Sequence, residues 1–269
     1  MSSALLLTYL IGHILGDYYF QSDEVASSKD YNIKALNKHG LIYLITMLLV
    51  TFPIYSYGFY NLNIVVAAII ISLIHYLLDL IKKNKQIDAD QKNMENSLKI
   101  KSYITDQLLH ILTILILTFL VENTKLFENF NGPFIKFTAN NLTVLPLAEF
   151  VQHISNFSYS DILSWILAIL IIIKPIQITI KIVLNNYKPD EKKEDNSLSN
   201  AGALIGVLER CIIFLLLASN QYAAIGFVLT AKSVARYNKI AEEHKFAEYF
   251  LLGTLLSTLL VIITYIIVI

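Results

Sequence analysis

The stretch LNIVVAAIIISLIHYLLDLI, residues 62–81, decides the fold class of this chain. A helix rises about 1.5 Å per residue, so a run of this length crosses the roughly 30 Å apolar core of a lipid bilayer. Only two ionisable side chains interrupt the run, His75 and Asp79. They are four residues apart, a little over one helical turn, and therefore project from the same face. The stretch predicts a transmembrane helix with one polar face.

Seven further stretches are apolar enough to resemble this one. The eight predicted spans are residues 4–20, 40–58, 62–81, 103–121, 161–184, 202–218, 222–236 and 247–269. Hydrophobic residues make up 55% of the 269 and the mean hydropathy is +0.57, which argues against an ordinary soluble domain. We expect an all-α, polytopic transmembrane bundle of about eight spans. The single cysteine, Cys211, excludes an internal disulfide and a metal site built from several thiolates.

The distribution of lysine and arginine predicts the orientation of the spans. When the eight spans are threaded alternately, the basic loops all fall on one side: 21–38, 82–102, 185–201 and 237–246. On the other side, the turns near 59–61 and 219–221 contain no lysine or arginine. By the positive-inside rule the basic loops are cytoplasmic and both termini lie outside. We therefore expect a multi-pass protein of the inner (cytoplasmic) membrane.

Three predicted spans carry a histidine and an aspartate four residues apart, and a histidine stands at the start of a fourth. These seven residues are His13, Asp17, His39, His75, Asp79, Asp106 and His110. Alternate threading puts all of them at one level, in the cytoplasmic leaflet. Ionisable groups inside a membrane are costly, and they usually have a function. The pattern predicts a polar site built by four helices.

Histidine nitrogens and carboxylate oxygens at this spacing are typical ligands of zinc, iron or manganese in helical bundles. We predict that members of this set hold a divalent metal ion, zinc in the first instance. Because seven groups exceed the ligands of one ion, Asp17, Asp79 or Asp106 can remain unligated and act as the catalytic base of a hydrolase. Two alternatives stay open. The same groups can relay protons or carry a cation in a transporter or channel, or they can only join helices in a structural partner subunit.

The second half of the chain carries cations inside its predicted spans. Lys232 and Arg236 are four residues apart and share a helix face. The planar guanidinium of an arginine suits carboxylate or phosphate. We predict an anion-binding set of Arg210, Lys232 and Arg236, with Glu209 and Glu248 as ion-pair partners. An anionic lipid or a phosphorylated small molecule would suit this set, whereas the charge pattern gives no sign of nucleic-acid binding or of oligomeric state.

The spans divide into two predicted halves. Residues 1–121 form a four-helix membrane half with the His/Asp set, and residues 161–269 form a second with the cationic set. Between them lies a predicted outer segment, 122–160, in which the amphipathic stretch 147–154 is expected to form a short interfacial helix. Gly12 and Gly16 flank His13 and predict close packing of the first helix against a neighbour.

Several of these motifs together resemble a known family. They are HILGDYYFQ at 13–21, His39, the His75 and Asp79 pair, Asp106-Gln107 with His110, GVLER at 206–210, AKSVAR at 231–236, Glu248-Tyr249 and Gly253-Thr254. As a set they resemble the bacterial membrane protein family known as domain of unknown function 3307. The resemblance implies a bacterial membrane protein and implies no activity. A metal-dependent hydrolase acting on an anionic or phosphorylated substrate remains the leading prediction from the residues.

Overall fold

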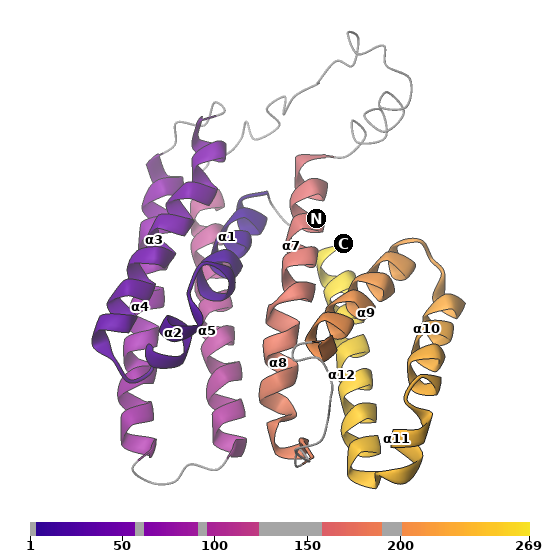
Figure 1. The fold of residues 1–269 in the computed structure, drawn as a ribbon. Coiled ribbons are helices and arrows are strands. Elements are labelled where there is room, and N and C mark those ends of the chain that lie inside the picture. Colours follow the sequence, from indigo (N-terminus) through magenta and orange to yellow (C-terminus); the bar gives the residue numbers. More distant parts are fainter. Residues whose placement is uncertain (1–3, 57–61, 91–95, 124–157, 190–200) are drawn as a thin grey trace, which may run out of the picture. The chain divides into compact units, whose positions relative to one another are not determined.

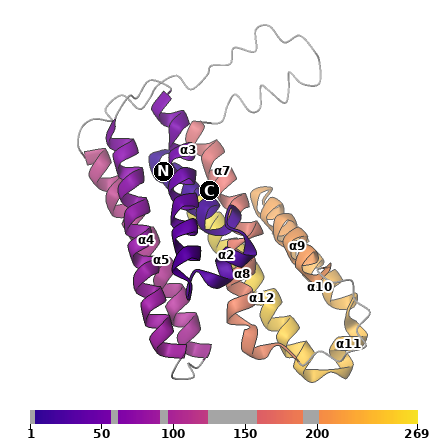
Figure 2. The same cartoon turned by 60° about the vertical axis from the view of Figure 1, so that its left-hand side comes forward.

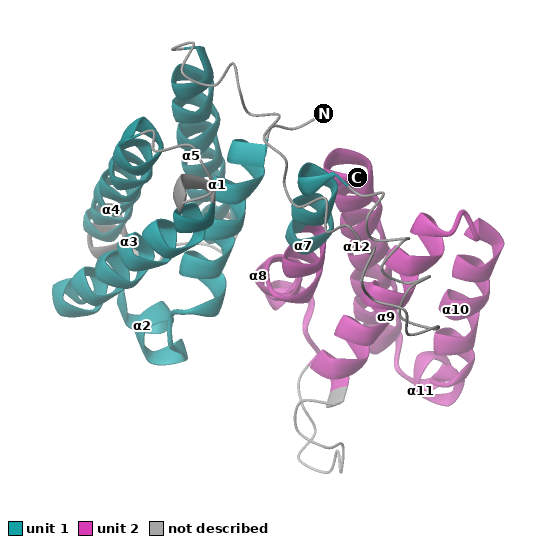
Figure 3. Cartoon of the chain, turned by 90° about the horizontal axis from the view of Figure 1, so that it is seen from above, with its two compact units in different colours: residues 1–167 teal, residues 168–269 magenta. Residues whose placement is uncertain are grey.

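The computed structural model describes residues 4–56, 62–90, 96–123, 158–189 and 201–269. Within these ranges the chain forms helices and short connections, with no strand (Figure 1). It divides into two compact units, Met1–Leu167 and Ala168–Ile269, coloured separately in Figure 3. The boundary falls inside one helix, so the predicted halves 1–121 and 161–269 stay predictions. The predicted segment 122–160, with its surface helix at 147–154, lies almost wholly outside the described residues.

Unit 1 is built on three long helices. They are α3 (Ile33–Ser56), α4 (Leu62–Asp90) and α5 (Asn96–Asn123), and they run side by side in Figures 1 and 2. The first described helix, α1 (Ala4–Ile14), packs against α3 and α5. A π-helical turn, η1 (Leu15–Tyr19), and a short helix, α2 (Asp23–Ser28), lead from α1 to α3.

Two glycines let α1 and η1 pack closely against α3. A Cβ placed on Gly12 would lie 2.6 Å from the sulfur of Met47, and one on Gly16 would lie 2.9 Å from the ring of Tyr43. Hence α1 and η1 lie directly on α3, as the two glycines predicted. Tyr43 and Met47 also belong to the apolar core of the described part of unit 1, which is formed by Leu5, Tyr9, Tyr43, Met47, Ile64, Ala67, Ala68, Ile71, Ile114 and Val121.

Unit 2 contains the remaining described helices. They are the end of α7 (Tyr159–Ile173), α8 (Pro175–Val183), the 3-10 turn η3 (Asn185–Tyr187), α9 (Ala201–Ala218), α10 (Tyr222–Val234), α11 (Tyr237–Glu242) and α12 (His244–Val268). Helix α12 packs against α8, α9 and α11, and α10 packs against α9.

Pro175 divides the predicted span 161–184 into α7 and α8. Proline has no amide hydrogen and cannot continue the hydrogen-bond ladder, so carbonyl groups near it need other donors. Arg210 supplies them, because its Nε donates to the carbonyl of Ile172 at 2.8 Å and its Nη2 donates to that of Ile173 at 3.4 Å. A buried guanidinium from α9 thus ties that helix to the end of α7.

Five helical segments are long and apolar enough to cross a membrane: Ile33–Pro53, Leu62–Asn84, Leu98–Asn123, Tyr159–Val183 and His244–Val268. Their outward faces are apolar too, and on α5 Leu108 and Phe119 are 60% and 65% exposed. Such surfaces suit lipid better than water. The described part of the chain is therefore all-helical, with five segments that are able to cross a membrane.

The predicted first, sixth and seventh spans coincide with shorter helices. Helix α1 has 11 residues, α9 has 18 and α10 has 13. The count of eight spans and the outside position of both termini stay predictions. The predicted loop 82–102 is largely helical, since α4 continues to Asp90 and α5 begins at Asn96. Polar residues end the apolar run there without ending the helix.

Gly16→Ala tests the close approach of η1 and α3. The added Cβ meets the Tyr43 ring at 2.9 Å and its Cα at 3.4 Å, so we expect the free energy of unfolding to fall by about 1–3 kcal/mol. Denaturant unfolding of the purified protein in detergent measures this. The matched control is Gly226→Ala on α10, where nothing lies within 4 Å and stability should stay the same or rise. Equal effects of the two substitutions would contradict the packing argument.

Candidate metal centre

Five helical segments of unit 1 converge on one buried polar cluster. His13 comes from α1, Asp17 from η1, His39 from α3, His75 and Asp79 from α4, and Asp106 and His110 from α5. All seven side chains are buried, and none is more than 8% exposed. The structure thus brings together the whole His/Asp set that the sequence singled out.

The Nε2 atom of His39 lies at the centre of this cluster. It is 3.1 Å from Nε2 of His75, 3.4 Å from Oδ1 of Asp17 and 3.4 Å from Oδ2 of Asp79. Nε2 of His75 is in turn 3.6 Å from Oδ2 of Asp79. One imidazole nitrogen carries at most one hydrogen, so it cannot donate to three neighbours at once. The convergence of these acceptor atoms favours a shared cation.

Two overlapping groups of residues have atoms close enough to hold a metal ion. Asp17, His39 and His75 form one, and His75, Asp79 and His110 form the other, with all ligand atoms of a group within 4.8 Å of one another. His75 belongs to both groups. Because they overlap, the arrangement suits one ion or two adjacent ions more naturally than two separate sites.

Several polar atoms of the cluster have no hydrogen-bond partner within the described part of the chain. They include both ring nitrogens of His110, Nδ1 of His39, Nδ1 of His75 and Oδ2 of Asp79. An unsatisfied buried polar group costs on the order of 1–3 kcal/mol, so native proteins seldom leave several together. A bound cation would engage such atoms, and the residues present therefore fit a metal ion.

Lys29, just after α2, lies inside the cluster, and the sequence did not single it out. Its Nζ is 2.8 Å from Oδ1 of Asp17, 3.6 Å from Oδ2 of Asp79 and 3.3 Å from Nε2 of His39. Burial lowers the pKa of the ammonium, but the two carboxylates outweigh burial and raise its pKa above the usual value. Lys29 thus remains charged and offsets one of the two buried carboxylates.

Neighbouring side chains fix the orientation of the cluster. The rings of Tyr43 and His75 stack at a centroid distance of 3.7 Å and an angle of 5°. The hydroxyl of Tyr43 is 3.1 Å from Nδ1 of His13, and the amide of Gln107 donates to Oδ2 of Asp17 at 3.1 Å. These contacts limit rotation of two histidines and one carboxylate, as second partners of metal ligands commonly do.

Asp106 lies at the edge of the cluster, outside both ligand groups. Its Oδ1 is 4.0 Å from Nδ1 of His110, and its Oδ2 is 3.3 Å from Nζ of Lys82. Lys82 is also 3.5 Å from Oδ1 of Asp30. Asp106 therefore lies at the edge of the cluster and forms an ion pair with Lys82.

The sequence predicted one regular α-helix through His13 and Asp17, but Asp17 lies in the π-helical turn η1 and therefore points in a different direction. The amide of Phe20 donates to the carbonyl of Leu15, five residues back, at 2.8 Å. The side-chain amide of Gln21 donates to the backbone carbonyl of Asp17. Such turns are rare and frequently occur at functional sites.

The cationic set predicted for the second half lies in unit 2. Lys232 pairs with Glu209 at 2.5 Å, and Arg210 binds the backbone carbonyls at the end of α7. Arg236 lies over the ring of Phe246, with 5.9 Å between Cζ and the ring centroid. Glu248 lines a small pocket near Lys188 and Lys245.

Sequence reasoning missed Lys29, Tyr43 and Gln107. Lys29 lies in the basic loop 21–38, where the pattern of charge indicates only the orientation of the spans. Tyr43 is one of 16 tyrosines and has no spacing that distinguishes it. Gln107 could have been predicted from the sequence, because it follows Asp106 directly in the motif that resembles the family.

Comparison with known protein families finds a match to part of the chain. The family model described as protein of unknown function (DUF3307) matches residues 5–135, which include the whole His/Asp set. The motifs after residue 135, among them GVLER and AKSVAR, lie outside the matched segment. Neither the curated proteins nor the solved structures contain a match.

Lys29→Met tests the charge balance of the cluster. The substitution leaves Asp17 and Asp79 without their ammonium partner, so we expect the free energy of unfolding of the chelator-treated protein to fall by about 3–5 kcal/mol. Denaturant unfolding in detergent measures it. Lys34→Met is the matched control, because it removes an exposed lysine close by in the chain and should change stability little. An unchanged stability in Lys29→Met would contradict the role assigned to the ammonium.

Proposed function

We propose that this chain, whose residues 5–135 match the DUF3307 family model, is a membrane protein that holds a divalent metal ion in unit 1. The ligands in this proposal are Asp17, His39, His75 and Asp79, with His110 as a neighbouring donor. Zinc is the metal that imidazole and carboxylate ligands in a tetrahedral arrangement suit best.

The spacing of the ligand atoms around His39 carries the proposal. Ligand atoms about 2.0–2.1 Å from a tetrahedral ion are roughly 3.3–3.4 Å from one another. The distances from Nε2 of His39 to His75, Asp17 and Asp79 are 3.1, 3.4 and 3.4 Å. The four potential ligand atoms come from three helical segments, and these three separations, with 3.6 Å between Nε2 of His75 and Oδ2 of Asp79, are close to those around a tetrahedral ion.

Hydrolysis is the activity we propose for this centre. A divalent ion, when bound, supplies a Lewis acid that polarises a carbonyl or phosphoryl oxygen and makes water a better nucleophile at neutral pH. Asp106, which belongs to neither ligand group, is suited to accept the proton of the attacking water. Lys82 holds the Asp106 carboxylate in place at 3.3 Å. The substrate class in this proposal is anionic or phosphorylated, and the site is that of an inner-membrane protein.

Cation transport is the second candidate, and the position of Lys29 favours it. An ammonium 2.8 Å from Asp17 and 3.6 Å from Asp79 competes with any cation that enters the cluster. Competition of this kind makes a bound cation releasable, which transport requires and catalysis does not. The two candidates share the ligands and differ in whether an ion crosses the membrane.

Metal analysis of the purified protein tests the centre itself. We expect about one divalent ion per chain after purification without chelator, and loss of that ion in His75→Ala, because His75 belongs to both ligand groups. Elemental analysis by mass spectrometry provides the measurement. His244→Ala, which removes an exposed histidine at the start of α12, is the control and should retain the metal. Metal-free wild type, with no binding when zinc is added back, would overturn the proposal.

Asp106→Asn separates hydrolysis from transport. If Asp106 is the general base, the variant should keep its metal and lose about 100-fold or more in the rate of release of phosphate or a phosphorylated head group. Asp161→Asn, an aspartate in the first turn of α7, is the control. Zinc flux into proteoliposomes is measured in parallel. Flux without hydrolysis in the wild type would replace the first candidate by the second.

A further inference from the structure

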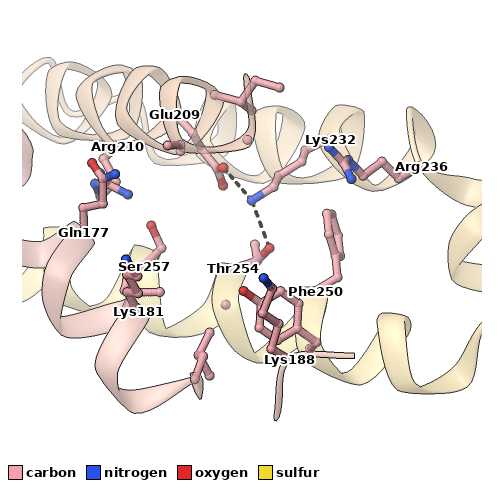
Figure 4. Close-up of a pocket in the computed structure, with 18 of the residues that line it drawn as sticks. Gln177, Lys181, Lys188, Glu209, Arg210, Lys232, Arg236, Phe250, Thr254 and Ser257 are labelled. Carbon is pink, nitrogen blue, oxygen red and sulfur yellow. Dashed lines mark hydrogen bonds and ion pairs between the residues drawn. The ribbon is translucent and has the colours of Figure 1, made fainter. Parts of the chain in front are cut away.

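Unit 2 contains a pocket of about 520 Å³, and all the residues that line it belong to this unit (Figure 4). Its walls come from α8, α9, α10, α12 and the residues that follow α8. Much of the wall is apolar, with aliphatic side chains from Ile180, Leu184 and Ile205 and rings from Phe246 and Phe250. Ligand sites in proteins commonly have volumes of roughly 300–1,000 Å³ and a mostly apolar lining. The pocket is therefore suited to enclose a hydrocarbon group.

Arg210 is a deeply buried cation in the lining of this pocket. It is 3% exposed, and its Nε and Nη2 donate to the carbonyls of Ile172 and Ile173. These acceptors carry no net charge. Proteins rarely bury a guanidinium completely unless an anion accompanies it. Within the described part of the chain, no carboxylate forms an ion pair with Arg210.

Glu209 is the carboxylate of the lining, and it is already paired. Its Oε2 lies 2.5 Å from Nζ of Lys232, which also donates to the hydroxyl of Thr254 at 3.1 Å, as the dashed lines in Figure 4 mark. Consecutive residues of a helix point about 100° apart, so Glu209 faces Lys232 although Arg210 follows it in the chain. The charge of Arg210 is thus not offset among the described residues.

One nitrogen of Arg210 is available to a ligand. Its Nη1 makes no hydrogen bond with the part of the chain that the structure describes. Nη1 lies beside Gly206, where a Cβ would be 3.3 Å away, and Gly206 itself lines the pocket. The glycine therefore leaves space next to the guanidinium.

Other polar side chains lie at the same end of the pocket. Figure 4 shows Gln177, Lys181 and Ser257 at the end that contains Arg210. Gln177 and Lys181 are four residues apart and share a face of α8. None of these three side chains forms a hydrogen bond with another described residue. They are thus able to donate to a ligand without breaking an existing interaction.

We propose that the Arg210 end of this pocket binds the carboxylate of a single-chain amphiphile of the fatty-acid type. Nη1 of Arg210 donates to the carboxylate, and the hydrocarbon chain lies against the apolar wall. One uncompensated buried charge requires one negative charge, which a carboxylate carries at neutral pH.

Hydrogen bonds between a guanidinium and a carboxylate are charge-assisted and therefore strong. The amide of Gln177 and the hydroxyl of Ser257 supply further donors for the two oxygens. Lys181 is exposed and adds electrostatic attraction. The inference does not rest on the metal centre, because every residue of the site belongs to unit 2.

The test measures binding of radiolabelled laurate to the full-length, delipidated protein in a neutral detergent. Three competitors separate the parts of the ligand: dodecanol has the chain without the charge, acetate has the carboxylate without the chain, and lysophosphatidylglycerol is a single-chain phosphodiester. We expect unlabelled laurate to displace the probe, and each of the three competitors to need at least about a tenfold higher concentration.

Two substitutions locate the carboxylate. Arg210→Gln removes the charge, and we expect it to raise the Kd for laurate at least about tenfold. Gly206→Ala retains the guanidinium but fills the space beside Nη1, so we expect a rise of about threefold or more. Gly202→Ala is the matched control, because it adds the same methyl group one turn earlier on α9, where nothing lies within 4 Å. It should leave the Kd unchanged.

Displacement by laurate, with a larger effect of Gly206→Ala than of Gly202→Ala, supports the inference. Equal displacement by dodecanol would overturn it, since the chain alone would then explain binding. Tighter binding of lysophosphatidylglycerol would overturn the choice of a carboxylate. Equal effects of the two glycine substitutions would remove Arg210 from the site. Because Arg210 also ties α9 to α7, the unfolding midpoint of each variant is measured, and Gly206→Ala decides the question if Arg210→Gln is unstable.

Discussion

Two buried carboxylates face one imidazole nitrogen, and the rest of unit 1 is arranged around that contact. Asp17 and Asp79 each lie 3.4 Å from Nε2 of His39, inside helices whose outer surfaces are apolar. Two negative charges at such short range repel each other strongly where little water is present. A cation must therefore accompany them, and Lys29 supplies one positive charge against two negative ones. A protonated His39, 3.4 Å from both carboxylates, or a bound cation would supply the second positive charge at this place.

Helix α3 holds the cluster together from the middle. It supplies His39, and one turn later it supplies Tyr43, whose ring stacks on His75 of α4 and whose hydroxyl meets His13 of α1. Gly16 allows η1 to lie against the same tyrosine ring. A single aromatic side chain thus couples helix packing to the orientation of two histidines. For that reason, the apolar core and the polar site of unit 1 cannot be changed independently.

The sequence predicted the parts of this structure that depend on local pattern. Long apolar runs located the five helices that can cross a membrane, and the spacing of His75 and Asp79 correctly suggested neighbours on one face. Hydropathy did not predict where the helices end, because α4 continues through polar residues to Asp90. It also gave no sign of Lys29, whose role depends on a fold that brings a loop lysine back over Asp17. Such long-range pairing leaves no periodic signal in a single sequence.

The π-turn at Leu15–Tyr19 has a consequence for how the cluster and the first helix influence each other. The extra residue in this turn puts the segments before and after it in different helical registers. Reverting to a regular α-helix would rotate one segment against the other by about 100°, the angle per residue, and would carry Asp17 away from His39 and Lys29. A cation at the cluster attracts the Asp17 carboxylate only in the register that the π-turn provides. Any cation held by Asp17 would therefore favour the register of the π-turn, and that register would in turn strengthen its binding.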